Sequence, residues 1–508
     1  MQRRKESDDY CVGNEVLTVH EKMKIEFTCD LAGTPFPLKH FWEYCVGSDH
    51  APVALRADWQ QQLKRCHEEL GFALVRFHGL LSDDLGTLVC ERDELVYSFY
   101  NADQIFDFLV SIGMRPFVEL SFMPTTLASG NKTVFHYKGN ITPPRDYKQW
   151  ATLIRKLVGH WVERYGIKEV REWKFEVWNE PNLKAFWSGT QRDYFKLYRY
   201  TVDAIKGVDS SLKVGGPATA MNEWIEEFRD FCQRNKVPLD FISTHHYPTD
   251  AFGEPGDDTE MQLSKSNRGA LRQEAQDARR RSGELSLYYT EWNSSSNPFD
   301  DLHDQPYAAA FVVKSVMDVA GVVDAYSFWT FSDIFEENYF PSIPFHGGFG
   351  LLTLHGIAKP TYRAFEVLHG LGDELLLVDG LHETVNVWVV RKEKIVTVLL
   401  TNHALPGHSI ETEHIVIRLA GAPKPRGAFA YRIDKDHANP RRMWQEMGAP
   451  TYPSAAELNV LSEASRVIPE KQSFKWTDKV ITFEVDLPSN AVAAIEVEVP
   501  DESRGDRK

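Results

Sequence analysis

Residues 173–182 read WKFEVWNEPN, a short run rich in apolar residues that ends at a glutamate and a proline. This composition predicts a β-strand over 173–180, because aromatic and β-branched residues favour strands and a proline ends one. A longer segment with helical spacing of its apolar residues follows over 191–206, and another short apolar run begins at residue 213. The stretch therefore predicts one strand–helix unit of a parallel sheet.

The same unit repeats along residues 39–371. Eight strand–helix units in succession indicate an α/β fold, a closed (β/α)8 TIM barrel over residues 31–371. The predicted strands are residues 39–46, 73–78, 115–122, 173–180, 213–217, 241–246, 285–291 and 325–331. The predicted helices are residues 57–70, 102–112, 146–164, 191–206, 222–235, 268–281, 305–320 and 360–371.

The pattern changes after residue 371 to short alternating strands separated by turn residues. This change predicts an accessory β-sandwich domain over 372–508, and the strand-like stretch 15–28 suggests that the N-terminal segment 1–30 contributes to it. The predicted sandwich strands are residues 374–378, 384–391, 395–401, 410–419, 427–433, 480–485 and 491–499.

Composition and charge narrow the class of partner. The chain of 508 residues carries a formal charge of −16, so we expect neither nucleic acid nor an anionic membrane surface as a partner, although the acidic excess could serve solubility alone. The six cysteines form no Cys-x-x-Cys pair, which argues against a zinc or redox motif. The charged start lacks the apolar stretch of a secretory signal, so we expect a cytoplasmic protein.

Two glutamates stand where a barrel enzyme carries its chemistry. Catalytic groups of barrels lie at the carboxyl ends of the strands, and strands four and seven end at Glu180 and Glu291, each flanked by Trp and Asn. Glycoside hydrolysis needs one carboxyl that protonates the leaving oxygen and a second that attacks the anomeric carbon or activates water. The alternative is that each glutamate pairs with an arginine in a purely structural role.

Seven blocks of sequence carry a resemblance to a known family. They are residues 41–42, 45–48, 116–124, 178–182, 245–248, 290–293 and 329–333, and together they span the predicted barrel. This set resembles glycoside hydrolase family 39, the family of β-xylosidases and α-L-iduronidases. The resemblance implies that Glu180 is the general acid/base and Glu291 the nucleophile of a retaining enzyme. The residues agree, because Trp178 and Pro181 can desolvate Glu180 and keep it protonated, whereas an attacking Glu291 must be ionised.

The resemblance also implies a set of sugar-binding residues. Asn179 is similar to the residue whose amide contacts the sugar 2-hydroxyl, and its alternative is a turn residue at a strand end. Trp329 resembles the aromatic floor of the sugar site, and its alternative is a core tryptophan. The remaining predicted substrate contacts are His50, His245, Tyr247 and, of the pair Glu336 and Glu337, Glu336.

No cofactor and no metal are expected. His245 and His246 could suggest metal ligation, but neighbours on a strand point to opposite faces of a sheet. None of the strand-end blocks carries an Arg or Lys beside the catalytic pair, which disfavours a substrate with a carboxylate.

The predicted activity is that of an exo-acting β-D-xylosidase, which releases xylose from the non-reducing end of short xylo-oligosaccharides by double displacement. The alternatives are another glycosidase of the family, of the α-L-iduronidase, β-glucosidase or arabinosidase type, and a non-catalytic carbohydrate-binding barrel. Residues 294–298 depart from the aromatic that the β-xylosidases tend to carry after the nucleophile, which leaves the outer subsite open. A homo-oligomer also stays open, since the family includes both tetramers and monomers.

Overall fold

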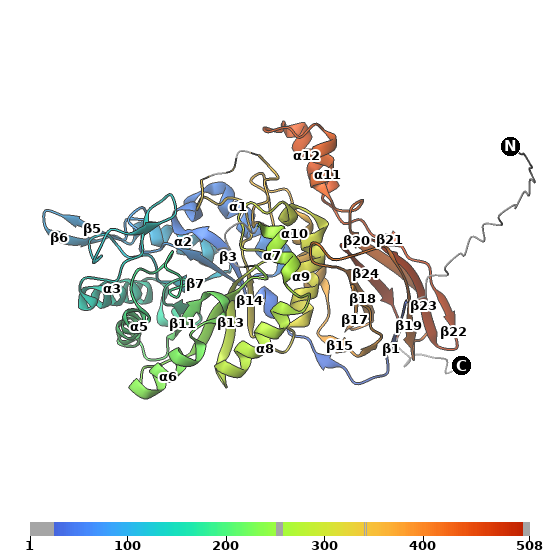
Figure 1. The fold of residues 1–508 in the computed structure, drawn as a ribbon, viewed down its shortest axis with the longest axis horizontal. Coiled ribbons are helices and arrows are strands. Elements are labelled where there is room, and N and C mark those ends of the chain that lie inside the picture. Colours follow the sequence, from blue (N-terminus) through green and yellow to red (C-terminus); the bar gives the residue numbers. More distant parts are fainter. Residues whose placement is uncertain (1–24, 250–257, 340, 342, 501–508) are drawn as a thin grey trace, which may run out of the picture.

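The computed structural model describes residues 25–249, 258–339, 341 and 343–500. Eight parallel strands close a barrel in the order β10-β11-β12-β13-β14-β3-β4-β7, which confirms the predicted (β/α)8 architecture (Figure 1). The strands are β3 (Cys45–His50), β4 (Leu74–His78), β7 (Arg115–Glu119), β10 (Lys174–Glu176), β11 (Lys213–Thr219), β12 (Phe241–His246), β13 (Ser286–Trp292) and β14 (Ala325–Phe328).

Helices surround the barrel, and local sequence signals set several of their ends. Thr190 and Asp193 form a reciprocal capping box at the start of α5, and Pro360 occupies the first turn of α10, where no amide donor is needed. The outer helices are α1 (Ala57–Leu70), α2 (Tyr100–Ser111), α3 (Tyr147–Tyr165), α5 (Gln191–Lys206), α6 (Ile225–Asn235), α8 (Ala270–Ser282), α9 (Pro306–Asp318) and α10 (Pro360–Gly370). Shorter helical segments are α4 (Ile167–Val170), α7 (Thr259–Lys265), η1 (Phe41–Glu43), η2 (Ala51–Leu55), η3 (Ala220–Asn222) and η4 (Asp301–Asp304).

The first barrel strand begins later than the sequence predicts. Residues 41–43 form the 3-10 turn η1, and the strand starts at Cys45 instead of residue 39. Phe41 and Trp42 are buried in the core, so the sequence shows an apolar run here as it would for a strand, although these residues form a turn.

Two sheets pack face to face beyond the barrel. One has the order β16-β1-β19-β23-β22 and the other β2-β15-β17-β18-β24-β20-β21, and their apolar side chains share one core cluster. The strands are β1 (Ile25–Asp30), β2 (Phe36–Pro37), β15 (Glu374–Leu376), β16 (Val378–Asp379), β17 (Val385–Lys392), β18 (Ile395–Asn402), β19 (Glu413–Ala420), β20 (Gly427–Ile433), β21 (Glu470–Lys471), β22 (Lys475–Thr477), β23 (Val480–Leu487) and β24 (Ala491–Glu498). Two small hairpin sheets, β5 (Leu88–Glu91) with β6 (Glu94–Tyr97) and β8 (Thr133–Val134) with β9 (Gly139–Asn140), lie outside both bodies.

The N-terminal strand β1 lies between β16 and β19, although β16 and β19 come from the far end of the chain. Of the strand-like stretch 15–28, residues 15–24 lie outside the described residues. β2 also pairs with β15, so pairing to the sandwich reaches residue 37. The domain boundaries after residues 30 and 371 stay predictions.

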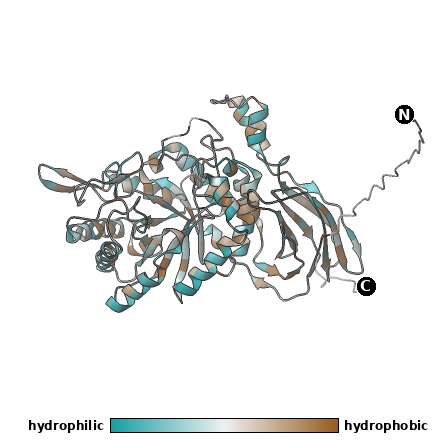
Figure 2. Cartoon of the chain, viewed as in Figure 1, coloured by the Kyte–Doolittle hydropathy of each residue, from teal (hydrophilic) through white to brown (hydrophobic). Residues whose placement is uncertain are grey.

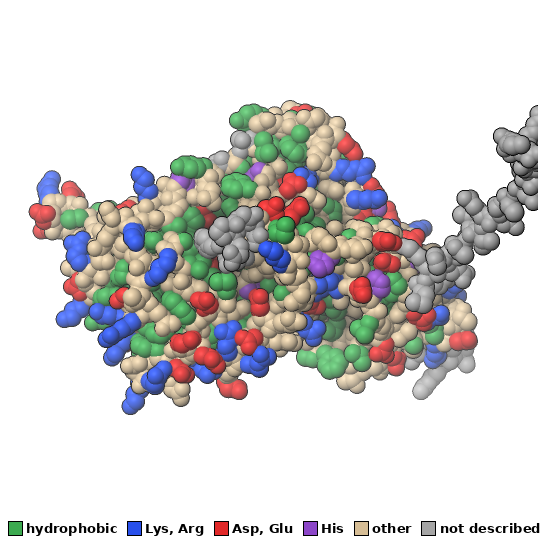
Figure 3. Space-filling view, in the orientation of Figure 1, with side chains coloured by type: hydrophobic (Ala, Val, Ile, Leu, Met, Phe, Trp, Pro, Cys, Tyr) green, Lys and Arg blue, Asp and Glu red, His purple; other side chains and the backbone are tan. Residues whose placement is uncertain are grey.

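Helices α11 (Pro440–Glu446) and α12 (Ala455–Ala464) project from the sandwich between β20 and β21 (Figure 1). Trp444 of this pair packs against Phe345, which follows β14 of the barrel. Figure 2 shows hydrophobic residues concentrated where barrel and sandwich meet, and hydrophilic residues along α6 and α8. Figure 3 shows charges of both signs interspersed over the visible face. In the described part of the chain, none of the helices combines the length and the apolar composition that crossing a membrane requires.

Candidate active site

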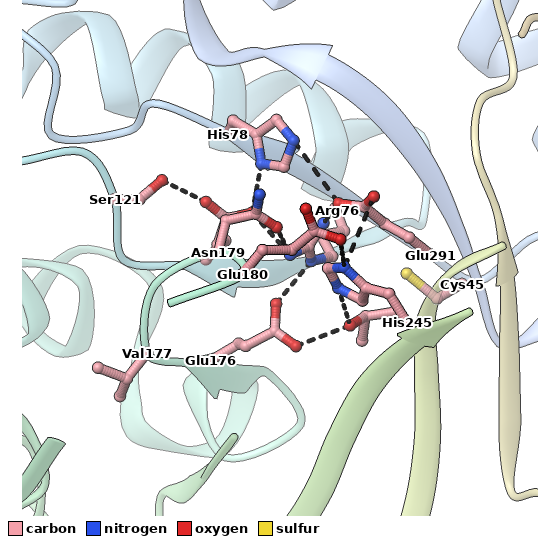
Figure 4. A network of polar contacts seen from close by, with 12 residues as sticks. Cys45, Arg76, His78, Ser121, Glu176, Val177, Asn179, Glu180, His245 and Glu291 are labelled. Carbon is pink, nitrogen blue, oxygen red and sulfur yellow. Dashed lines mark hydrogen bonds and ion pairs between the residues drawn. The ribbon is translucent and has the colours of Figure 1, made fainter. Parts of the chain in front are cut away.

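The carboxyl ends of five barrel strands bring one cluster of buried polar side chains together (Figure 4). Every member is at most 8% exposed, so each charge needs a partner within the cluster. The members are Arg76 and His78 of β4, Glu119 of β7, Glu176 of β10, Asn179 and Glu180 just after β10, His245 of β12, and Glu291 of β13. The sequence prediction that strands four and seven aim their glutamates at one place thus agrees with the geometry.

The two candidate catalytic carboxyls lie close together. His245 Nδ1 lies 3.0 Å from Glu180 Oε1 and 3.7 Å from Glu291 Oε2. One oxygen of each glutamate and a nitrogen of His245 all lie within 4.8 Å of one another. Inverting glycosidases separate their carboxyls by about 6.5–9.5 Å to admit a water, whereas retaining enzymes keep them about 5–5.5 Å apart. The spacing fits direct attack on the sugar by one carboxylate.

Glu291 has a hydrogen-bond donor on each oxygen. Arg76 Nη1 donates to Oε1 at 2.7 Å, and the Tyr247 hydroxyl donates to Oε2 at 3.1 Å. Burial, together with the carboxyls of Glu291 and Glu180, raises the pKa of Tyr247 well above its usual value, so its hydroxyl keeps the proton that it donates. These two donors fix the orientation of the Glu291 carboxyl group, as a nucleophile requires.

A row of hydrogen bonds from Glu176 through Thr290 and His245 reaches Glu180 and favours the protonated form of Glu180. Thr290 donates its hydroxyl proton to Glu176 at 2.8 Å, and its oxygen accepts from His245 Nε2 at 3.1 Å. Burial, together with the nearby guanidinium of Arg76, lowers the pKa of His245 well below its usual value, so its ring is neutral. Nδ1 is then an acceptor, and only a protonated Glu180 can donate to it.

Arg76 contacts most members of the cluster, and its role could not be predicted from the sequence. Its guanidinium donates to Glu176 at 2.6 Å and to Asn179 Oδ1 at 3.0 Å, and it pairs with Glu119 at 2.9 Å. Burial alone would raise the pKa of Glu119, but His78, Arg76 and Ser121 lower it, whereas burial raises the pKa of Glu176 more than Arg76 lowers it. The only signal in the sequence was a charged residue inside an otherwise apolar strand.

Arg76 changes one premise of the sequence analysis. An arginine does lie beside the catalytic pair, although none of the strand-end blocks carries one. Its guanidinium is fully buried and occupied by the carboxylates of Glu119, Glu176 and Glu291. It is therefore not available to clamp the carboxylate of a substrate.

A cavity of about 350 Å³ opens over this cluster. Its inner wall holds the polar residues His78, Asn179, Glu180, Tyr247, Glu291, Trp329 and Glu337. A Cβ on Gly47 would come within 2.5 Å of the Trp329 ring, so only glycine lets that ring lie against β3. Among the described residues that line the cavity, none is Lys or Arg.

Four predicted site residues line this cavity beside the catalytic pair or support it, and two do not. Asn179, Tyr247 and Trp329 line it, and His245 supports the pair from below. His50 and Glu336 are paired with each other at 3.3 Å instead, and it is Glu337 that lines the cavity. The sequence offered two adjacent glutamates, and the path of the loop after β14 selects the second.

Glu337 and His50 differ in the hydrogen bonds that their side chains form. Burial and the nearby carboxyls of Asp49, Glu291 and Glu180 raise the pKa of Glu337 well above its usual value. Its Oε1 is buried without a hydrogen-bond partner among the described residues. Burial alone would lower the pKa of His50, but Asp49 and Asp84 raise it to about 9. Glu337 therefore offers a carboxyl group to a ligand, whereas His50 is already engaged.

Two groups of side chains in the described ranges could hold a metal ion by composition. They are Asp49, His50 and Glu336, and the catalytic set Glu180, His245 and Glu291. In both sets the histidine already uses both of its ring nitrogens in hydrogen bonds. His50 contacts Asp49 and Asp84, and His245 contacts Glu180 and Thr290. His246 does not join the second set, because it points away from the cavity and contacts the rings of Tyr289 and Tyr326.

Comparisons with known proteins agree with this geometry. The profile of glycosyl hydrolases family 39 matches residues 23–480. A β-xylosidase of Caldicellulosiruptor saccharolyticus is 49% identical over 468 residues, which cover 91% of this chain and 96% of that protein. A β-xylosidase of Geobacillus stearothermophilus is 40% identical over 91% of this chain and 93% of its own. The crystal structure of the GH39 enzyme from Xanthomonas axonopodis pv. citri superposes with a TM-score of 0.84 at 32% identity and covers 96% of this chain and all of that one. With the barrel, the paired glutamates and these matches, the chain belongs to glycoside hydrolase family 39.

Proposed function

We propose that this protein is a retaining exo-β-D-xylosidase that releases xylose from short xylo-oligosaccharides. The observation that carries the proposal is the close pair of Glu180 and Glu291, of which Glu180 contacts His245 and Glu291 accepts from Arg76. Similarity to two β-xylosidases over most of the chain supports the choice of xylose. The cytoplasmic location and a homo-oligomeric assembly stay predictions of the sequence.

The geometry supports a double displacement. Glu291 attacks the anomeric carbon while the bond to the leaving oxygen breaks, and Glu180 gives its proton to that oxygen. Water then attacks the same carbon, the ester bond to Glu291 breaks, and Glu180 takes the proton of the water. Arg76 and Tyr247 hold the Glu291 carboxylate in place through both steps.

The inner wall of the cavity supports binding of a neutral sugar. Trp329 offers a ring face to the pyranose C–H groups, and Asn179 lies next to the acid, where the 2-hydroxyl would lie. We infer that the carboxyl of Glu337, and not that of Glu336, accepts sugar hydroxyls, because its Oε1 lies 3.6 Å from His78 Nε2 but forms no hydrogen bond to a described residue. His50 and Glu336 pair with each other and do not line the cavity. The absence of Lys and Arg from the described lining disfavours a uronic acid.

Two variants test the roles of the glutamates. Glu291→Ala should remove turnover of every β-xyloside by at least about 10⁴-fold, because no other described side chain replaces the nucleophile. Glu180→Ala should spare aryl xylosides with good leaving groups at least about 100-fold more than xylobiose, since only a poor leaving group needs the acid. Equal losses on both substrates would contradict the assignment.

Trapping of the intermediate tests the mechanism directly. A 2-fluoro-β-xyloside with a good leaving group should label the protein, and peptide mapping should place the label on Glu291. A panel of nitrophenyl glycosides should show the β-D-xyloside as the preferred glycone. Stable sugar binding without turnover of any activated glycoside would favour a non-catalytic carbohydrate-binding barrel instead.

A further inference from the structure

The outer half of the cavity differs in character from the inner half. The loops after β10 and β11 contribute a group of apolar side chains to its lining. We call this set the aglycone wall, and its members are Leu183, Ala185, Phe186, Ala220 and Met221. The inner wall holds the catalytic pair, and three further polar residues, Thr249, Ser296 and Asn338, also line the cavity outside both sets.

The position of the acid shows what the aglycone wall contacts. Glu180 protonates the leaving oxygen, so the body of the leaving group must lie on the outer side of Glu180. Leu183, Ala185 and Phe186 follow Glu180 within six residues along the same loop. A leaving group that extends out of the site therefore passes over these side chains and reaches Met221.

The loop that carries Met221 has an unusual backbone. Met221, Asn222 and Trp224 of this loop, and Ala218 near the end of β11, all adopt positive φ angles, between 53° and 60°. Such conformations cost about 1–3 kcal/mol each for residues with side chains, and they persist only where the surroundings impose them. A loop that only joins a strand to a helix does not need such backbone angles.

Asn182, the last residue of the motif that holds the acid, imposes the loop conformation. Its side chain donates to the carbonyl of Ala220 at 3.1 Å and accepts from the amide of Ala220 at 3.0 Å. The amide of Glu180 itself donates to the carbonyl of Ala218 at 2.8 Å. The acid and the loop that presents Met221 are thus fixed to each other.

Met221 is 47% exposed, although a methionine gains free energy when it is buried. It lies at the rim of the cavity, where a bound leaving group would cover it. Thioethers make favourable contacts with aromatic rings, worth about 0.3–1.5 kcal/mol. Phe186 in the same wall adds a ring face for stacking.

We propose that the aglycone wall is a binding site for an aromatic leaving group, and that Met221 sets the preference for an aromatic ring over a second sugar. The proposal rests on the proposed β-xylosidase activity. It predicts substrates in which xylose is linked to a benzyl or phenolic group. A second xylose that lay over the aglycone wall would bring hydroxyl groups against its apolar side chains, which offer them no hydrogen bonds.

Kinetics with matched leaving groups test this preference. Methyl and benzyl β-D-xyloside release alcohols of nearly equal acidity, so their ratio of kcat/KM reports contact with the ring and not bond chemistry. The natural protein should favour the benzyl compound by at least about 10-fold, and Met221→Ala should reduce that ratio by about 3- to 10-fold. Met221→Leu, which keeps the apolar bulk, should retain most of the preference.

Two controls separate this effect from damage to the site. β-D-Xylosyl fluoride has no aglycone body, so Met221→Ala should leave its kcat/KM within about 2-fold. Met261→Ala removes a methionine that is 49% exposed on α7 but does not line the cavity, and it should leave the ratio unchanged. Equal losses on all three substrates with Met221→Ala would overturn the proposal, as would a benzyl-to-methyl ratio near one in the natural protein.

Binding separates failure of this proposal from failure of the proposed function. Glu291→Gln should bind benzyl β-xyloside at least about 5-fold more tightly than the methyl compound by calorimetry, whether or not the natural protein turns either over. Turnover of no β-xyloside, the fluoride included, would count against the β-xylosidase activity. Equal binding of both compounds, or tighter binding of xylobiose than of the benzyl compound, would count against the aromatic site.

Discussion

Arg76 is the residue on which the charges of the active site converge. It contacts Glu119, Glu176 and Glu291 inside the buried cluster, and its own side chain has no exposed area. Arg76→Met should lower the free energy of unfolding by about 3–5 kcal/mol, because removal of one partner leaves buried carboxylates unpaired. Arg76→Lys keeps the charge but loses the fork of donors that orients Glu291, so it should lower kcat/KM by at least about 100-fold with a smaller loss of stability.

Urea unfolding and kinetics measure both effects of the Arg76 variants. Arg92→Lys is the matched control, since Arg92 is 92% exposed and, among the described residues, pairs with Glu91 alone, at 4.0 Å. It should change neither quantity. Full activity of Arg76→Lys would show that the charge alone, and not the geometry of the guanidinium, supports the nucleophile.

His50 makes stability depend on pH. Its pKa rises from 6.5 to about 9 because Asp49 and Asp84 outweigh the effect of burial, and Glu336 lies 3.3 Å away. A raised pKa in the folded protein stabilises it fully below pH 6.5, and this contribution is lost as the pH rises through about 9. The free energy of unfolding should therefore fall by roughly 3 kcal/mol across that window.

His50→Gln should flatten this fall. Urea unfolding at pH 6.5 and pH 9.5 measures it, and the variant should lose less stability between the two values than the natural protein does. His414→Gln removes a surface histidine that pairs with Asp486 and serves as control. Parallel losses in the natural protein and His50→Gln would show that another group carries the pH dependence.

The sequence predicted the residues of this site that follow a positional rule. Glu180 follows β10 and Glu291 is the next-to-last residue of β13, and Asn179 and Trp329 lie just beyond strand ends, where barrel enzymes keep their chemistry. Glu119 and Glu176 are the last residues of β7 and β10, but the predicted strands ran on to residues 122 and 180 and so left both glutamates inside a strand. Their contacts with Arg76, in the middle of β4, arise only because β4, β7 and β10 meet around a closed barrel. Such contacts across the barrel leave no mark in the order of the residues.

At the scale of elements, one buried lysine fixes the loops that follow strands β13 and β14. Lys359 Nζ lies 2.6 Å from Asp304 of η4 and 2.7 Å from Asp333, which follows β14, and all three side chains are fully buried. The two aspartates in turn accept from the amides of Gly347 and Gly350. This arrangement holds the segment that brings Phe349 to the cavity.

Removal of this lysine should loosen both loops. Lys359→Met leaves two buried carboxylates without their cation and should lower the free energy of unfolding by about 3–5 kcal/mol. The measurement is urea unfolding, with the exposed Lys424→Met as control. A loss below about 1 kcal/mol would mean that the aspartates are satisfied by their backbone donors alone.

The sequence predicted the helices and strands whose apolar residues recur with the period of that element. It failed where burial in the folded protein does not follow such a period. Helices α11 and α12 escaped the sequence analysis because they are short and cover only a small cluster around Trp444 and Leu461, so their apolar spacing is weak. The turn η1 resembled a strand because Phe41 and Trp42 are buried. In both cases tertiary packing, and not local propensity, decides the element.

At the scale of the whole molecule, α9 joins the barrel to the sandwich. Every residue of this helix from Tyr307 to Met317 is buried, which is rare for an outer helix of a barrel. It packs against β18 and β24 of the sandwich as well as against α10. The apolar residues Val390, Leu399 and Val492 of the sandwich belong to the same core cluster as the barrel.

Polar contacts reinforce this junction. Arg268, between α7 and α8, donates to the carbonyls of His403 at 2.7 Å and Thr384 at 2.6 Å, at the ends of the sandwich strands β18 and β17. Arg363 of α10 donates to the carbonyl of Ser465 at 2.7 Å. Exposing the shared core would cost free energy in proportion to the apolar area involved. Neither body can lose the other without uncovering part of its own interior.

We therefore expect barrel and sandwich to unfold in one transition. Tryptophan fluorescence reports mainly the barrel, because only Trp388, Trp444 and Trp476 lie beyond residue 371, whereas far-ultraviolet circular dichroism reports both bodies. The two signals should give coincident urea curves. Arg268→Ala should shift both curves together to lower urea, because it leaves the carbonyl of His403 without this donor and removes one of the two donors to the carbonyl of Thr384. Two separate transitions, or a shift of the dichroism curve alone, would show that the shared core around α9 does not couple the two bodies.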